Sequence, residues 1–320
     1  MLRYIYTLGP ATTSVDLIST FLESAESFRL NSSHLNEYEL DLWLRKIDKV
    51  FQRKNKAIPV IIDLQGGKMR IGDYPSVDTV PKEIILKYAS STDDKSIIPV
   101  PHEEFFQTVE VGDIVLLNDA KMKLKVMAVG VQAIEAVVIV NGPLSSNKGV
   151  NITTHPVKFR NFTLKDENII KTALRYNFTQ FAFSFLSDGN EADKIRPLIA
   201  GRKLIAKIER VDAFEYLNNI DDKFDEIWLC RGDLGAQAGI HNLGMLQNVF
   251  IKKIPQLKNK CFLAGQVLEH MTNFKMPTRS EIVHLYDSEK NGFAGIVLSD
   301  ETAVGEFPLS VVEFLVSYRI

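Results

Sequence analysis

The chain has only two cysteines among its 320 residues, Cys230 and Cys261, and both fall in apolar runs. These positions favour buried thiols over a disulfide framework, and a reducing compartment is expected. There is also no apolar stretch long enough to span a membrane, and Met1-Leu-Arg-Tyr leads into a strand-like run without a signal-peptide pattern. These absences predict a cytoplasmic protein with no membrane partner.

An excess of charge of either sign is lacking as well. Lysine and arginine total 38, aspartate and glutamate total 40, and the net charge is −2. This balance argues against a general binder of nucleic acids or anionic membranes, so any anion site must be a local cluster of cations. With 45% hydrophobic residues, the chain has enough material for one large domain plus an insertion.

Short apolar runs recur along the chain, and most are separated by segments of helical periodicity. Apolar residues follow the i, i+3, i+4, i+7 pattern from Val15 to Ala25 and again from Leu40 to Phe51. Alternating strands and helices imply parallel strands, and eight such units predict an α/β fold of the closed (β/α)₈ barrel type. The expected strands are Arg3–Leu8, Phe28–Ser32, Pro59–Leu64, Gln180–Phe185, Lys203–Ile208, Glu226–Cys230, Lys260–Ala264 and Gly295–Ser299.

The interval from about Gly72 to Asn147 does not follow this alternation of strands and helices. It contains alternating β-branched runs and turn signals but little helical periodicity. We therefore expect a barrel in residues 1–72 and 148–320, with a small all-β lid domain inserted after the third strand at residues 73–147. An insertion at this end of a barrel strand would overhang the catalytic face. The expected strands of the insertion include Ile114–Leu117, Lys123–Met127 and Ala133–Val140, and Pro308–Ile320 is expected to form the eighth barrel helix.

Two neighbouring strands end abruptly in charged residues. One delivers Lys207 and Glu209 on the same side of the strand, and the next delivers Arg231 and Asp233 in a glycine-flanked turn. Surface ion pairs would explain either segment alone. Polar or charged groups follow nearly all the expected strands, however, and these ends form the active site of a barrel. The pattern therefore predicts a site for a divalent metal and a phosphorylated anion.

Dispersed motifs resemble the pyruvate kinase family over essentially the whole chain. The matching segments are Arg29-Leu-Asn-Ser-Ser-His34, Asp63 to Gly72, Lys148-Gly-Val-Asn151, Ala206-Lys-Ile-Glu209, Arg231-Gly-Asp-Leu-Gly235, Met276-Pro-Thr-Arg279 and Leu298-Ser-Asp-Glu-Thr-Ala303. The resemblance implies a glycolytic phosphotransferase that passes the phosphoryl group of phosphoenolpyruvate to ADP or another nucleoside diphosphate, giving pyruvate and ATP. It also implies a monomer or small homo-oligomer, and the C-terminal regulatory domain of the family is expected to be absent.

The resemblance further implies a role for each matching residue. Lys207 would stabilise charge on the phosphoryl group and the enolate, and Arg29 would clamp phosphate. The implied catalytic set is Lys207, Arg29, Ser299 and Glu301, and the implied substrate-binding set is Arg29, Lys207, Gly232, Asp233, Gly265 and Ser184. The implied nucleotide-binding set is Pro10, Arg29, Asn31, His34 and Lys148. Glu209 and Asp233 would bind Mg²⁺ or Mn²⁺, and the monovalent-cation position would comprise Asn31, Ser33, Asp63 and Leu64.

Several of these residues have structural alternatives. Asn31 and Ser33 could cap the following helix, since both residue types favour that position. For His34 a packed or capping role is favoured over a catalytic one, and Arg70 could be a structural partner of the insertion instead of a phosphate ligand. Asp119 matches a family residue of the lid only through a weak motif.

Lys68 departs from the family members that require potassium, which carry a glutamate at this position. Its ammonium group would supply the charge of the ion, and Leu64 and Gln65 also fit the potassium-independent type. We therefore predict that no potassium is required.

Gly265 is a second departure, because the family has a threonine whose hydroxyl helps to position the proton delivered to the enolpyruvate. Loss of one such group costs on the order of 10²-fold in rate. Three smaller departures are Gly67, Arg210 and Asp300. Gly265 and Asp300 alter the proton-delivery side and spare the metal side, which leaves open an enzyme that has kept the enolpyruvate and metal site for another acceptor or for lyase chemistry. A non-catalytic regulatory homologue is the third alternative.

Overall fold

The computed structural model describes residues 1–118, 121–152 and 162–318, so that Asp119 lies outside the described residues. The chain forms two compact units, each of which is described by itself. The first comprises Met1–Gly66, Phe162–Gly232 and Gly244–Ile320, and the second comprises Gly67–Asn161 and Asp233–Leu243. Within the described residues, no helix is long and apolar enough to cross a membrane.

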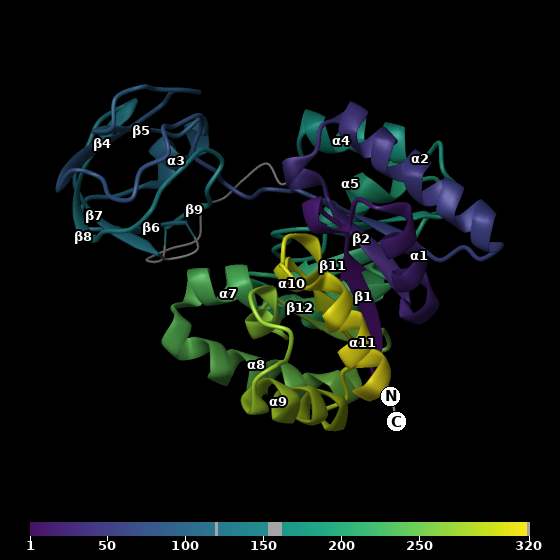
Figure 1. Cartoon of the computed structure of the whole chain (residues 1–320). Helices are drawn as coiled ribbons and strands as arrows, with labels where there is room; N and C mark the ends of the chain where they lie inside the picture. Colours follow the sequence, from purple (N-terminus) through teal and green to yellow (C-terminus); the bar gives the residue numbers. More distant parts are fainter. Residues whose placement is uncertain (119–120, 153–161, 319–320) are drawn as a thin grey trace. The chain divides into compact units, whose positions relative to one another are not determined.

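The first unit is built on eight parallel strands that close into a barrel in the order β1-β14-β13-β12-β11-β10-β3-β2. Helices surround the strands of this unit (Figure 1). Its strands are β1 (Arg3–Thr7), β2 (Ser27–Asn31), β3 (Val60–Leu64), β10 (Thr179–Phe183), β11 (Leu204–Ile208), β12 (Glu226–Cys230), β13 (Cys261–Ala264) and β14 (Gly295–Leu298). The predicted (β/α)₈ barrel is confirmed. Its strands appear in the sequence as continuous apolar runs because a barrel strand is buried on both faces.

Helices follow the strands. The α-helices are α1 (Val15–Ser24), α2 (Glu37–Lys54), α4 (Leu164–Ala173), α5 (Glu191–Ile195), α6 (Leu217–Lys223), α7 (Arg231–Ala238), α8 (Leu243–Lys253), α9 (Arg279–Lys290), α10 (Asp300–Ala303) and α11 (Pro308–Tyr318). Of these, α1, α2 and α11 each bury an apolar face. Helix α7 begins in the first unit and continues from Asp233 in the second. The longest, α2, begins with a capping box formed by Asn36 and Glu39 and ends at Asn55, which adopts the left-handed conformation. Its buried stripe, Leu40 to Phe51, is the one that the periodicity predicted.

Short 3₁₀ turns connect several of these elements. They are η1 (Pro10–Thr12), η2 (Ser32–His34), η3 (Arg196–Leu198), η4 (Asp212–Tyr216), η5 (Ile240–Asn242), η6 (Ile254–Gln256) and η7 (Glu269–Thr272). Two of them, η1 and η2, directly follow the C-terminal ends of β1 and β2. They therefore place Pro10 and His34 beside the strand ends at which the site was predicted.

The second unit contains a six-stranded sheet in the order β5-β4-β8-β7-β6-β9. Its elements are β4 (Glu83–Lys87), β5 (Ile97–Pro99), α3 (Glu103–Thr108), β6 (Ile114–Leu117), β7 (Met122–Val129), β8 (Ala133–Val140) and β9 (Val150–Ile152). Its apolar core is separate and includes Phe105, Val115 and Leu124. The predicted β insertion after the third barrel strand is confirmed. The unit extends beyond the expected range of 73–147 because β9 pairs with β6 and Arg70 bridges to Gly149.

Candidate active site

Four ionised side chains meet at the C-terminal ends of neighbouring barrel strands. Arg29 lies on β2, Asp63 on β3 and Lys207 on β11, and Glu209 directly follows β11. The parallel register places Asp63 beside Asn31 on one side and Ala182 on the other, which brings the ends of β2, β3 and β10 together. We call Arg29, Asp63, Lys207 and Glu209 the charge cluster.

Short contacts join the members of the charge cluster. Arg29 donates to Asp63 Oδ2 from Nε at 2.8 Å and from Nη2 at 2.6 Å. The Lys207 Nζ atom lies 3.1 Å from the same Asp63 oxygen and 2.8 Å from Glu209 Oε1, and it donates to Ser184 Oγ at 2.9 Å. An ammonium group has three N–H donors, so these partners use all of them. A phosphate that binds Lys207 must therefore replace one of these contacts.

Electrostatics keeps the charge cluster ionised. Lys207 is 7% exposed, and Asp63 and Glu209 are each 2% exposed. Burial alone would lower the pKa of Lys207, but the Asp63 and Glu209 carboxylates outweigh it and raise that pKa above its ordinary value. Burial would raise the pKa of Asp63, but Lys207 and Arg29 bring it below its ordinary value. Two cations therefore balance two carboxylates, and Lys207 remains an ammonium at neutral pH.

The backbone of Phe185 holds the remaining oxygen of Glu209. Its N–H donates to Glu209 Oε2 at 2.9 Å, and its φ of 58° lies in the left-handed region that a bulky side chain rarely adopts. Such strained backbone clusters at functional sites. Phe185 is not among the site residues expected from the sequence, because an apolar residue after a strand gives no indication of its φ angle.

Arg231 opens helix α7, so the segment expected to be a turn is the first turn of a helix. Its guanidinium donates to the carbonyl of Gly265 from Nε at 2.9 Å and from Nη2 at 2.6 Å, and to the carbonyl of Gln266 at 2.7 Å. Gly265 has a φ of +87°, and a Cβ atom there would lie 3.2 Å from Gly232 N. Gly232 and Gly265, both in the implied substrate-binding set, therefore lie side by side, with glycine matched to this backbone conformation.

Glu301 is fully buried and binds backbone groups of two loops. Its Oε1 accepts from Leu268 N at 3.0 Å and its Oε2 accepts from Ser299 N at 2.7 Å. Burial raises the pKa of Glu301, although these two hydrogen bonds act in the opposite direction. This geometry indicates a residue that orders the loops after β13 and β14. The neighbouring Asp300 is exposed.

The implied nucleotide and monovalent-cation residues are partly engaged in structural contacts. Asn31 Oδ1 accepts from Ser33 N at 3.2 Å, which is the capping arrangement weighed for this segment. The Leu64 carbonyl accepts from Ser184 Oγ at 2.8 Å, and Asp63 already bears the bidentate contact from Arg29. Pro10 and His34 are exposed.

The other implied residues lie in the second unit. Lys68 Nζ is 2.5 Å from Asp233 Oδ1, an ion pair that the sequence did not predict. Arg70 donates from Nη1 to the Asn147 carbonyl at 2.7 Å, which supports its structural reading. The neighbouring Lys148 is half-buried, and its carbonyl accepts from Ile71 N at 2.9 Å.

The donor chemistry of Glu209 and Asp233 fits a divalent cation. Both offer carboxylate oxygens, the ligands that Mg²⁺ and Mn²⁺ prefer. Each also contacts a lysine ammonium, Lys207 for Glu209 and Lys68 for Asp233, so each carboxylate is already held as an anion by a counter-charge. Over residues 1–118, 121–152 and 162–318, no group of three or more His, Cys, Asp or Glu side chains is arranged to hold a metal ion.

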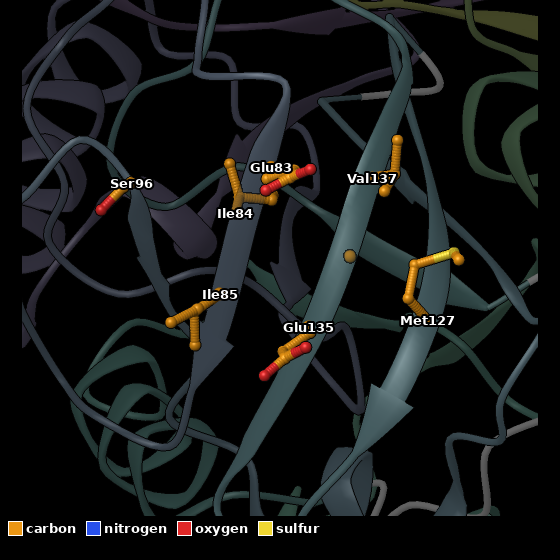
Figure 2. A pocket seen from close by; sticks show the side chains of 8 residues that line it. Glu83, Ile84, Ile85, Ser96, Met127, Glu135 and Val137 are labelled. Atoms are coloured by element: carbon orange, nitrogen blue, oxygen red, sulfur yellow. The ribbon is translucent and has the colours of Figure 1, made fainter.

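A hollow of about 570 Å³ lies on the sheet of the second unit, across β4, β7 and β8 (Figure 2). Apolar side chains such as Ile85 and Met127 line it together with the carboxylates of Glu83 and Glu135. Two anionic groups without a cation would repel a phosphate. We therefore assign the phosphate chemistry to the charge cluster and not to this hollow.

Comparisons with known proteins agree with this geometry. The family profile described as "Pyruvate kinase, barrel domain" matches residues 2–312. The chain is 30% identical to the pyruvate kinase of Agrobacterium vitis and 28% identical to that of Thermococcus litoralis. These matches cover 98% of this chain and 67% and 68% of the two relatives. A third relative, pyruvate kinase 2 of Synechocystis, is 30% identical over 98% of this chain and 55% of its own length. The chain belongs to the pyruvate kinase family.

Proposed function

We propose that the chain transfers the phosphoryl group of phosphoenolpyruvate to ADP or another nucleoside diphosphate, giving pyruvate and a nucleoside triphosphate. The observation that carries this proposal is the charge cluster, in which Lys207 is buried and held protonated by two carboxylates. Phosphoryl transfer depends on positioning and on fixed charge that stabilises the oxygens in flight. A permanent ammonium in a water-poor site supplies that charge without reorganisation.

Each residue of the site has a distinct part in this proposal. Lys207 exchanges one of its present contacts for a phosphoryl oxygen, and Arg29 fixes Asp63, so that Lys207 stays in place during the exchange. Glu209 and Asp233 would hold Mg²⁺ or Mn²⁺, which when bound would neutralise negative charge on the phosphoryl oxygens. Gly232 and Gly265 would receive the carboxylate end of the substrate. The cytoplasmic location and the monomeric or small homo-oligomeric state belong to the same proposal.

The direct test mixes purified protein with phosphoenolpyruvate, ADP and Mg²⁺ and follows ATP and pyruvate together. We expect the two products in equal amounts and no product when EDTA removes the metal. No turnover, with phosphoenolpyruvate and Mg²⁺ still raising the melting temperature, would contradict the proposal and favour a binding role.

A second candidate is supported by the backbone at Gly265. This residue offers no hydroxyl for proton delivery, whereas the charge cluster on the phosphoryl side is complete. An enzyme with this arrangement could pass the phosphoryl group to another acceptor or carry out lyase chemistry on an enolpyruvate. Deuterium exchange into the methyl group of pyruvate separates the two candidates, since it reports proton transfer at carbon alone.

The substitution Gly265→Thr is expected to destabilise the protein by about 1–3 kcal/mol without speeding this methyl exchange. A threonine at a φ of +87° is strained, and its Cβ would press on Gly232 N at 3.2 Å. The matched control is Gly201→Thr, because Gly201 has a φ of +74° and nothing within 4 Å of its added Cβ. Urea denaturation measures both variants, and a faster exchange in Gly265→Thr would show that the missing hydroxyl alone limits protonation.

Potassium independence is also part of the proposal. It is supported by Asp63, whose charge Arg29 and Lys207 already balance, and by the cation of Lys68. The expected result is an equal rate in potassium and lithium buffers for the unchanged protein. The substitution Lys68→Glu should lower the rate in lithium by about tenfold or more, with recovery in potassium, because it replaces a cation by a second carboxylate beside Asp233.

The matched control for that experiment is Lys68→Met, which removes the cation without adding a carboxylate. It should lose activity in both salts and recover less in potassium. A rate that rises several-fold with potassium in the unchanged protein would refute this part of the proposal.

A further inference from the structure

Arg231 and His284 form a side-chain hydrogen bond that the function described above does not use. Arg231 Nη1 lies 2.7 Å from His284 Nε2, and His284 projects from α9. A guanidinium can only donate, so His284 Nε2 must be the acceptor. The imidazole is therefore neutral, with its proton on Nδ1.

The imidazole is the side-chain partner of an otherwise backbone-bound guanidinium. The other hydrogen bonds of Arg231 go to the carbonyls of Gly265 and Gln266, and Arg231 forms no ion pair with any residue of the described ranges. Burial lowers the pKa of Arg231 to about 10, and only the more distant Glu301 opposes this effect. Such a cation tolerates a neutral acceptor but not a second positive charge.

The charges around His284 make its protonation unfavourable. Burial is the largest cause that lowers its pKa, the Arg231 guanidinium from α7 lowers it further, and Asp287 on α9 raises it. The pKa of His284 is therefore below its ordinary value. Over the described residues, Arg231 and Asp287 are the two charged groups whose fields reach the ring.

We propose that His284 is a positioning residue that holds the Arg231 guanidinium on the Gly265 and Gln266 carbonyls, and that its protonation in mild acid releases this hold. Gly265 also lies beside Gly232, since a Cβ atom added at Gly265 would be 3.2 Å from Gly232 N. Release would therefore loosen two residues assigned above to the substrate site. The catalytic consequence depends on the proposed function, whereas the effect on stability does not.

The sign of the pH dependence follows from the lowered pKa. The unfolded chain binds a proton at His284 near the ordinary value of about 6.5, whereas the folded protein resists protonation to a lower pH. The stabilisation that neutral His284 provides is fully present above its pKa in the unfolded chain. It is lost as the pH falls from that pKa through the lower pKa of His284 in the folded protein.

The test compares the unchanged protein with His284→Gln, whose amide oxygen can replace Nε2 as an acceptor but does not titrate. Melting temperature and kcat are measured at about pH 7.5 and about pH 5.5, on either side of the ordinary histidine value. The expected result is a kcat that falls between the two pH values by about twofold more in the unchanged protein than in His284→Gln, because the lowered pKa leaves part of His284 neutral at about pH 5.5. KM should change less than kcat. The acid-induced fall in melting temperature should shrink by about 2–4 °C.

His241→Gln is the matched control because His241 is exposed on η5, and this variant should keep both pH responses of the unchanged protein. His284→Ala should lower kcat at both pH values, because it removes the acceptor altogether. If His284→Gln does not fold, the titration of the histidine rings by NMR still decides. The ring of His284, assigned by the signal that is lost in His284→Ala, must remain a neutral Nδ1–H tautomer below the ordinary histidine pKa.

Two results would overturn the proposal: equal pH responses in His284→Gln and the unchanged protein, or an NMR signal of the His284 ring that titrates at the ordinary value. The melting temperature and the NMR titration can both be measured without turnover. A protein without the proposed kinase activity could therefore still show the predicted Arg231–His284 linkage.

Discussion

The substitution Lys207→Met is expected to reduce phosphoryl transfer by about 10²–10³-fold or more, because it removes a preorganised cation from the site of charge development. It should also destabilise the protein by about 3–5 kcal/mol, since Asp63 and Glu209 then share one remaining cation, Arg29, in a buried site. Steady-state kinetics and urea denaturation measure the two effects on the same sample.

The two effects of this substitution can be separated by a second change. In the double variant Lys207→Met, Glu209→Gln, the remaining Arg29 and Asp63 form a balanced pair. This variant should regain a large part of the lost stability but none of the activity. The matched control is Lys203→Met, at the exposed start of the same chain segment, which should change stability by less than about 0.5 kcal/mol. A single variant as stable as the unchanged protein would contradict the charge balance described for the cluster.

The substitution Gly66→Ala is expected to destabilise the protein by more than about 3 kcal/mol and to lower activity. A Cβ at this position would lie 2.3 Å from the carbonyl oxygen of Ser184, and the φ of +58° is itself unfavourable for alanine. Relief of this overlap must move Ser184, whose hydroxyl accepts a hydrogen bond from Lys207. The structural change is thus passed to the charge cluster.

The control for Gly66→Ala is Gly201→Ala, which has a similar φ of +74° but nothing within 4 Å of the added Cβ. Gly201→Ala should lower the stability by only about 1 kcal/mol, which is the cost of placing alanine at a positive φ. Thermal denaturation of both variants gives the difference. Equal losses in the two variants would mean that the loop after β3 can move away from Ser184 without strain.

The sequence predicts the barrel well because two independent signals mark each strand. Its residues form an apolar run, and its end is marked by a polar or charged group, as at Asp63 and Lys207. The strands lie within one or two residues of their expected bounds. The helix α2 is predicted equally well, because its capping residues and its apolar stripe agree about where it begins and which side is buried.

The contacts within the site could be predicted only in part. The sequence identifies Lys207 and Glu209 as neighbours on one strand, but it does not show that Asp63 neutralises the lysine, because that contact spans 144 positions. The strained backbone of Phe185 and the neutral state of His284 depend on partners that are distant in the sequence. Hydrophobic periodicity indicates which side chains are buried and toward which face they point, but it does not identify distant partners of this kind.

Closure of the barrel has a consequence for how the chain is made. Strand β1 pairs on one side with β2 and on the other with β14, through partners such as Tyr4 and Ile296. During synthesis, one edge of β1 therefore stays unpaired until β14 (Gly295–Leu298) has left the ribosome. Exposed strand edges can pair with other chains, and such distant pairings form slowly. Nascent chains of this protein should therefore depend on chaperones until their last barrel strand emerges.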